Sequence, residues 1–154
     1  MATGWGRQVR LDFQKLATQN TTLKTYTTPF AALCTVNPAD DGSGNATPGT
    51  TEPSSTGSYA RQAITWTAPT QPANDAAVVA ANSATISWTS TAAFSTGATV
   101  LPYVAIYNTA TLATITEAAF LGRAAITGGG FAVNASGITL SIAAGGLTMN
   151  CISA

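Results

Sequence analysis

The chain has 154 residues, a formal net charge of zero and only 8% charged residues, against about 25% in an ordinary soluble protein. This length fits one domain with its own core, and the weak charge excludes binding to nucleic acid or to a membrane surface through a basic patch. The sequence has no histidine, the commonest general base and metal ligand. We therefore expect no enzyme and no cofactor or metal site. We expect a permanently assembled protein, because a net charge near zero favours association.

The N-terminal segment, residues 1–28, is set apart by its charge and by its spacing of apolar residues. Val9, Phe13 and Leu16 recur at helical spacing, which predicts a short amphipathic helix or arm over residues 7–17. Residues 1–24 hold four basic residues and one acidic residue, a net charge of +3, and the rest of the chain carries −3. The basic residues are Arg7, Arg10, Lys15 and Lys24. Two interpretations stay open: a solvated helix face, and a basic arm that docks on an acidic neighbouring subunit.

Residues 29–154 have the pattern of one antiparallel all-β domain. Short alternating or apolar runs are separated by turn-forming residues at a spacing of roughly 8–12 residues, which predicts about seven to nine short strands in a β-sandwich or jelly-roll-like domain. The sandwich topology stays open. Pro102 predicts an edge or a bulge within its run. The expected strands are 30–36, 59–68, 76–81, 84–88, 100–108, 118–126, 131–134, 138–142 and 147–151.

A long polar stretch, residues 39–57, separates the first expected strand from the second. It consists of turn-forming residues without a large apolar side chain, so we predict a surface loop. Asp40, Asp41 and Asn45 loosely resemble a calcium loop. The full spacing and the closing Glu are missing, and an Asp-Gly turn is the better interpretation.

Few residues could carry chemistry. Cys34 and Cys151 lack metal-ligand spacing; we expect two buried thiols, and a disulfide stays open only if the last strand pairs near the first. Four carboxylates lie in expected loops, with nothing that places a pair in an aromatic cleft: Asp40, Asp41, Glu52 and Asp75. Arg61 and Arg123 are cations inside expected strands, where a partly buried Arg needs a partner. Asp75, Glu117 and an acidic residue of a neighbouring subunit are the candidates.

The most distinctive stretch is Gly57 to Trp66, GSYARQAITW. Ile64, Trp66 and Ala68 alternate with Thr65 and Thr67, which predicts a well-buried strand with one apolar face. Arg61 is held beside this strand. The simplest interpretation is that its stem packs over Tyr59 or Trp66.

Taken as a string, SYARQAITW after a Gly/Ser/Thr turn resembles a family of small tailed-phage virion proteins, which are tail fibre or capsid decoration (cement) proteins. The family pattern is a short strand, an acidic Gly-rich loop, a Tyr-Ala-Arg-Gln strand, and a later strand ending in Gly-Ile-Tyr-Asp or similar. Val104 to Asn108 is similar to that later strand, with Asn108 where Asp is common. The turn at Ala143 to Gly146 is similar to the family's last turn. The resemblance covers about residues 30–150 and is weak outside 58–66, 104–108 and 138–149.

The resemblance implies a virion structural protein without enzymatic activity, assembled in the host cytoplasm and seated on the outside of the capsid. It would bridge and stabilise subunits of the major capsid protein, as a homo-oligomer, with a trimer expected. The basic N-terminal arm favours this cement role over the first alternative, a tail fibre or receptor-binding module. A second alternative is a carbohydrate-binding module, which needs an aromatic platform, whereas the alternation predicts that Trp66 and Trp88 lie in the core. The expected interface residues are Arg7, Arg10, Phe13, Lys15, Lys24 and Arg61.

Overall fold

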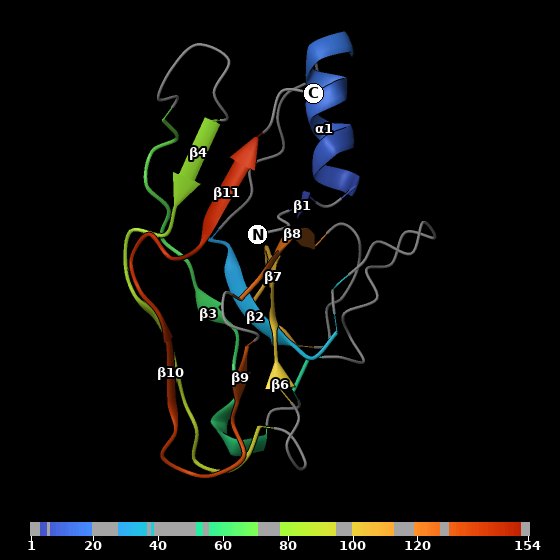
Figure 1. Cartoon of the computed structure of the whole chain (residues 1–154). Coiled ribbons are helices and arrows are strands. Elements are labelled where there is room, and N and C mark those ends of the chain that lie inside the picture. The colour runs from blue at the N-terminus through green and yellow to red at the C-terminus, as the bar shows by residue number, and fades with distance from the viewer. Residues whose placement is uncertain are drawn as a thin grey trace.

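The computed structural model describes residues 4–5, 7–19, 28–36, 38, 52–53, 56–70, 78–94, 100–112, 119–126 and 130–151. These residues form an all-β, sandwich-like fold of antiparallel sheets, as the sequence predicts, with an N-terminal α-helix (Figure 1). Among these residues, no helix has the length and apolar character needed to cross a lipid bilayer.

Apart from a short strand at residues 4–5 that the sequence did not predict, the strands lie close to their predicted positions, and most are shorter than predicted. In the described part of the chain the strands are β1 (Gly4–Trp5), β2 (Phe30–Cys34), β3 (Gln62–Ala63), β4 (Val78–Ala81), β5 (Ile86–Thr89), β6 (Val100–Leu101), β7 (Tyr103–Tyr107), β8 (Phe120–Ala125), β9 (Phe131–Ala132), β10 (Thr139–Ile142) and β11 (Thr148–Cys151). Where an edge or a bulge was expected, Pro102 separates β6 from β7, because proline has no N–H to donate to a strand ladder.

The central sheet has five strands in the order β1-β8-β7-β2-β3. Phe30 to Cys34 of β2 lie opposite Tyr107 to Tyr103 of β7, and both strands are buried on their two faces. Their nearly continuous apolar sequences, FAALC and YVAIY, are explained by this burial. Three ribbons of two strands each are also present among the described residues: β10–β5, β11–β4 and β6–β9.

Side-chain alternation along the central strands divides the interior into two clusters. Leu33, Val104 and Ile106 belong to the larger cluster, together with Trp88 of β5 and Leu140 of β10. The intervening residues of the same strands, including Cys34, Ala105 and Tyr107, form a second cluster with Phe120 of β8. Since successive side chains of a strand point to opposite faces, the β5–β10 ribbon packs on one face of the central sheet.

The stretch 59–68 is not the single strand that its alternation predicts. Gln62 and Ala63 pair with β2, after which Trp66 forms a bridge with Asn82 and Thr70 forms one with Val79. The chain therefore passes from the central sheet to the β4–β11 ribbon and cannot stay paired with one strand. Ile64 is buried and the threonines 65 and 67 are exposed, as the alternation predicts. Ala68, which was expected on the buried face, is exposed, so the prediction is wrong at this position.

The N-terminal segment contributes directly to the β domain. The predicted helix is α1 (Arg7–Gln19), and Val9 belongs to the larger core cluster. Before the helix, β1 pairs antiparallel with β8, with Gly4 opposite Arg123 and Trp5 opposite Gly122. Residues 1–28 are thus joined to residues 29–154 by a strand pair and a core contact, while the upper part of α1 stands above the central sheet in Figure 1.

Candidate functional site

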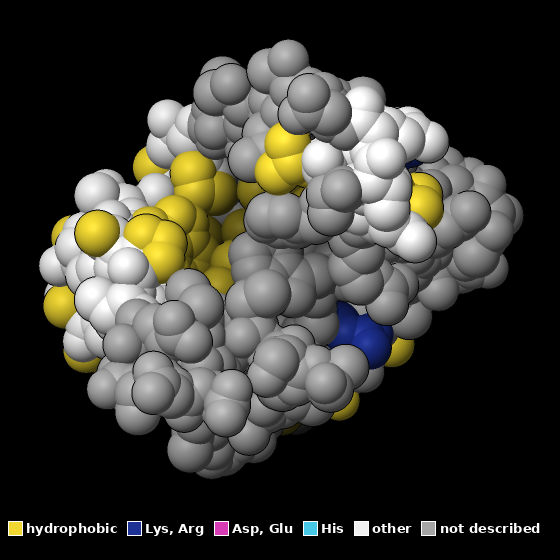
Figure 2. All heavy atoms as spheres, turned by 90° about the horizontal axis from the view of Figure 1, so that it is seen from above, with side chains coloured by type: hydrophobic (Ala, Val, Ile, Leu, Met, Phe, Trp, Pro, Cys, Tyr) yellow, Lys and Arg dark blue, Asp and Glu magenta, His cyan; other side chains and the backbone are white. Residues whose placement is uncertain are grey.

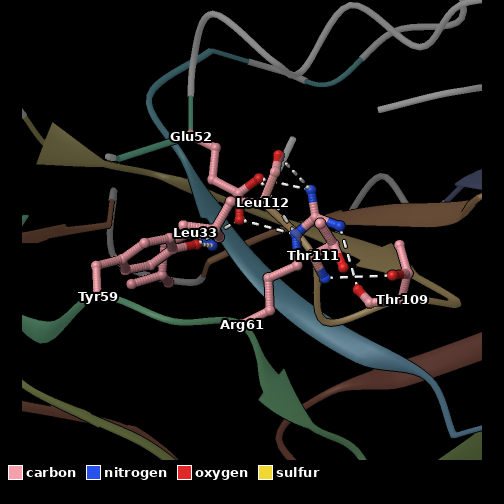
Figure 3. A network of polar contacts seen from close by, with 7 residues as sticks. All are labelled: Leu33, Glu52, Tyr59, Arg61, Thr109, Thr111 and Leu112. Carbon is pink, nitrogen blue, oxygen red and sulfur yellow. Dashed lines mark hydrogen bonds and ion pairs between the residues drawn. The ribbon is translucent and has the colours of Figure 1, made fainter. Parts of the chain in front are cut away.

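The most connected polar group of the described structure is the guanidinium of Arg61 (Figure 3). Its Nη2 lies 2.8 Å from Oε2 of Glu52, and its Nε lies 3.0 Å from Oε1 of the same carboxylate. The side chain of Arg61 is 0% exposed and that of Glu52 is 4% exposed. The two groups therefore form a two-pronged ion pair shielded from water, the strongest geometry for an arginine–carboxylate contact.

The remaining donors of Arg61 reach a turn that is distant in sequence. Nη1 donates to the carbonyl oxygen of Thr109 at 3.1 Å, and Nη2 donates to that of Leu112 at 3.3 Å. Within this turn, the Thr111 N–H donates to Oγ1 of Thr109 at 3.2 Å. One side chain thus fixes both the end of the long polar stretch and the turn that follows β7.

Tyr59 provides the second contact to Glu52. Its hydroxyl donates to Oε1 of Glu52 at 2.9 Å and accepts a hydrogen bond from the Leu33 N–H at 2.9 Å. Burial raises the pKa of Tyr59 well above its ordinary value of 10.0, and the Glu52 charge raises that pKa further. The phenol therefore stays neutral and acts as a donor, and its ring packs edge-on against Phe94 with centroids 5.3 Å apart.

The local sequence explains why Tyr59 and Arg61 meet one carboxylate. Residues at i and i+2 of an extended chain point to the same side, and both side chains are buried while Ala60 between them is exposed. The preceding turn has positive φ at Gly57 and Ser58. A Cβ at Gly57 would lie 2.4 Å from the carbonyl oxygen of Ala92, so only glycine fits there.

Tyr107 closes the site from the side of the sheet. The Arg61 Cζ lies 3.8 Å from the centroid of the Tyr107 ring, a cation–π contact. The Tyr107 hydroxyl is buried and has no hydrogen-bond partner among the described residues. Its pKa is raised, chiefly by burial and then by Cys34 and Glu52, whereas Arg61 lowers it.

We refer to Glu52, Tyr59, Arg61 and Tyr107 as the Arg61 clamp. A guanidinium stays protonated in proteins, and the Glu52 carboxylate already accepts from Arg61 and Tyr59. These two groups, bound to each other and to Tyr59, therefore fix positions in the chain. The clamp joins three segments that are not neighbours in sequence.

The partner of Arg61 differs from the sequence-based candidates. The expected partners were Asp75, Glu117 or a neighbouring subunit, and both of these acidic residues lie outside the described part of the chain. In the structure the partner is Glu52. Glu52 lies in a stretch of turn-forming residues, for which the sequence predicts a solvent-exposed loop. No pattern in the sequence marks this pairing. The Arg61 guanidinium lies over the ring of Tyr107, a contact that the sequence did not indicate.

Of the six expected interface residues, the structure describes the side chains of Arg61 and Lys15. Arg61 is buried inside the domain and bound to Glu52, so it does not face a neighbouring subunit as expected. Lys15 is exposed on α1. Arg7, Arg10 and Phe13 also lie on α1, but their side chains are outside the described part, as is all of Lys24.

The other candidate residues are only partly described. Arg123 is half-buried, and its Nη1 donates to the carbonyl oxygen of Pro38. Cys34 is buried and forms no disulfide among the described residues, whereas the side chain of Cys151 lies outside them. The calcium-like stretch at Asp40, Asp41 and Asn45 also lies outside. Among the described residues, no group of three side chains could hold a metal ion.

The prediction that Trp66 and Trp88 lie in the core is confirmed for Trp88, whereas Trp66 is only partly buried. Trp88 is 1% exposed, and its Nε1 donates to the carbonyl oxygen of Ala60 at 3.0 Å. Trp66 is partly buried and packs against the larger cluster. Neither offers the flat exposed platform that a carbohydrate-binding module needs.

Asn82 is a structural residue that sequence reasoning missed. It is buried, its Nδ2 donates to the carbonyl oxygens of Ala84 and Ala143, and its Oδ1 accepts from the Leu147 N–H. It therefore ties the bend after β4 to the bend after β10. An Asn next to Ser in a small-residue stretch predicts a turn, and nothing local indicates that the side chain spans two turns.

Comparison of the sequence with protein-family models and with curated proteins gives no match.

Proposed function

We propose that this chain is a structural protein of a tailed-phage virion, and specifically a capsid decoration protein that bridges major capsid subunits from the outside. The observation that carries the proposal is the Arg61 clamp. The Tyr-Ala-Arg stretch on which the family resemblance depends has its two large side chains buried and bound to one carboxylate. This stretch fixes the position of Glu52, near the end of the long polar stretch. Such a structural use of Tyr59 and Arg61 fits a protein with a structural role.

The weakly charged surface supports the same proposal. In the view from above, few Lys or Arg side chains and no Asp or Glu side chains are seen among the described residues, while apolar side chains gather on one side (Figure 2). Among the described residues, three large apolar side chains are exposed: Val36 (56%), Val100 (42%) and Phe131 (36%). Apolar groups outside the core, on a chain of zero net charge, favour burial against another protein.

The N-terminal helix is the proposed contact with the capsid. Lys15 is exposed on α1, and the segment of residues 1–24 carries a charge of +3. Such a segment would be steered to an acidic patch on a capsid subunit by complementary charge. Arg61, being internal, supports the fold and takes no part in this contact.

Location in the particle is the direct test. Antibodies against this chain, applied to purified virions for immuno-electron microscopy, should label the capsid surface. Label at the tail would refute the decoration role and support the tail fibre alternative. Absence of the chain from purified virions, checked by mass spectrometry, would refute both.

Binding to shells tests the role of α1. Removal of residues 1–24 would also remove β1 and Val9 from the fold, so substitutions are the better probe. We expect the Arg7→Gln, Arg10→Gln, Lys15→Gln and Lys24→Gln variant to co-sediment poorly with shells that lack this protein. The matched control replaces Gln14, Thr18 and Gln19 of the same helix with Ala and should bind as the native chain does. Equal binding by both variants would refute the helix contact.

A further inference from the structure

Strand β10 has an open edge. In the described part of the chain it pairs with β5 and with no other strand, from Thr139 opposite Thr89 to Ile142 opposite Ile86. In Figure 1 it lies at the left margin of the molecule. An open edge presents unbonded N–H and C=O groups to any other extended chain.

The ladder with β5 shows which groups point outward. The Ser90 N–H donates to the carbonyl oxygen of Ile138 at 3.0 Å, and bonded and non-bonded pairs alternate along an antiparallel ladder. Leu140 and Ile142 therefore bond to β5, whereas Thr139 and Ser141 direct their N–H and C=O groups away from it. The 3.0 Å contact between the hydroxyls of Thr89 and Thr139 agrees, because side chains are closest in non-bonded pairs.

Within the part of the chain that the structure describes, this edge lacks the usual protection. Natural sheet edges are covered, or carry charged residues, proline or a bulge. Thr139 to Ile142, TLSI, contains no charged residue and no proline, and its pairing with β5 is regular. No hydrogen bond within the described part of the chain reaches the outward groups of Thr139 and Ser141.

We propose that β10 pairs antiparallel with β10 of a second copy of this chain, about a twofold axis at Leu140. In this register Thr139 exchanges both backbone hydrogen bonds with Ser141 of the partner subunit, and Ser141 does so with the partner's Thr139. The two β5–β10 ribbons become one four-stranded sheet. The inference does not depend on the proposed virion function.

The side chains favour a second copy as the occupant. On the inner face, the same register sets Ile138 against the partner's Ile142, and both isoleucines are only partly buried within one chain. On the outer face, Thr139 and Ser141 are exposed, and they extend the row of hydroxyls that begins with Thr89. A chain of zero net charge meets no overall repulsion from its copy. The contact is twofold, unlike the trimer that the family resemblance implies.

The test compares two substitutions at one position. Ser141→Pro removes an outward N–H that bonds to nothing within the described chain, whereas Ser141→Ala keeps it. A contact of one short strand is small, so we expect a dimer whose population rises with protein concentration. Sedimentation velocity should show this dimer for the native chain and for Ser141→Ala, and a monomer for Ser141→Pro. Circular dichroism establishes that each variant is folded.

Amide exchange in the native chain gives an answer even if Ser141→Pro fails to fold. The amides of Thr139 and Ser141 should become more protected as protein concentration rises, while those of Leu140 and Ile142, already bonded to β5, should change little. A native chain that stays monomeric, forms a trimer, or shows no concentration-dependent protection at Thr139 and Ser141 would overturn the proposal. A folded Ser141→Pro variant that dimerises like the native chain would do the same.

Discussion

Arg61 shows how a buried cation is accommodated in a chain with few charges. Its guanidinium is removed from water, which is costly unless a carboxylate and further acceptors replace the solvent. Glu52 and the carbonyl oxygens of Thr109 and Leu112 supply these contacts. The native positions of these segments thus depend on the Arg61–Glu52 pair, and loss of either partner should lower the free energy of unfolding strongly.

We expect Glu52→Gln to lower the free energy of unfolding by roughly 3 kcal/mol, because it leaves Arg61 as a buried charge without its counter-ion. In a separate cycle, the double variant Glu52→Leu with Arg61→Met should lose less stability than the sum of the losses of Glu52→Leu alone and Arg61→Met alone. Urea denaturation of the four proteins measures this coupling. Additive losses would show that the two side chains do not act as a pair.

Asn82 connects two turns through its amide. Asn82→Ala should lower the free energy of unfolding by about 2–3 kcal/mol, because the buried Leu147 N–H and the carbonyl oxygens of Ala84 and Ala143 lose their partners. Ser83→Ala, which removes an exposed hydroxyl from the next residue, should change it by less than about 0.5 kcal/mol. Thermal denaturation compares them, and equal losses would contradict the role of Asn82.

At the scale of elements, turns place the clamp as firmly as strands do. Gly57 brings the chain past Ala92 at a distance that excludes a Cβ, and the Thr91 N–H donates to its carbonyl oxygen at 2.9 Å. This contact sets where Tyr59 and Arg61 enter the core. The short η2 turn (Thr56–Ser58) therefore helps to position the Arg61 clamp.

Gly57 and Gly137 both have left-handed backbone conformations, but only Gly57 has a close neighbour where a Cβ would be. Substituting each glycine therefore separates the cost of backbone strain from the cost of a steric clash. Gly57 has φ +71° and Gly137 has φ +79°, but a Cβ at Gly137 meets nothing within 4 Å. Gly137→Ala should cost about 1–2 kcal/mol from the left-handed conformation alone. Gly57→Ala should cost clearly more, because the Ala92 backbone must move. Chemical denaturation measures both, and similar losses would show that the turn relaxes freely.

At the scale of the whole molecule, β2 and β7 organise two clusters that contain buried tyrosines. Tyr59 belongs to the larger cluster and Tyr107 to the second. Both phenols have their pKa raised above 10.0 by burial, and the Glu52 charge raises them further. The free energy of unfolding should therefore fall at alkaline pH, because these two buried phenols resist ionisation in the folded chain.

Between pH 10 and the raised pKa values, the unfolded chain releases the protons of Tyr59 and Tyr107 while the folded chain keeps them. Their contribution to stability is thus complete below pH 10 and falls above it, by up to about 1.4 kcal/mol per pH unit for each tyrosine. Tyr107→Phe should reduce this fall, and it removes a hydroxyl without a described partner. Urea denaturation at pH 8 and pH 11 checks this; an equally steep fall in the variant would refute it.

The local pattern of side chains was enough to predict the antiparallel β fold, the helix α1, and the burial of Trp88 and Ile64. These features depend on residues a few positions apart, because strand and helix periodicity decides which side chains can share a buried face. The family resemblance and the virion role derived from it stay predictions.

The tertiary structure alone decided the partner of Arg61, the two-turn role of Asn82 and the division of residues 59–68 between two sheets. Arg61 finds acceptors 9, 48 and 51 residues away, and Asn82 reaches acceptors and a donor up to 65 residues away. Such contacts depend on how sheets pack, which no local periodicity encodes. The open edge of β10 is of the same kind, because a strand becomes an edge only through the order in which the whole chain pairs.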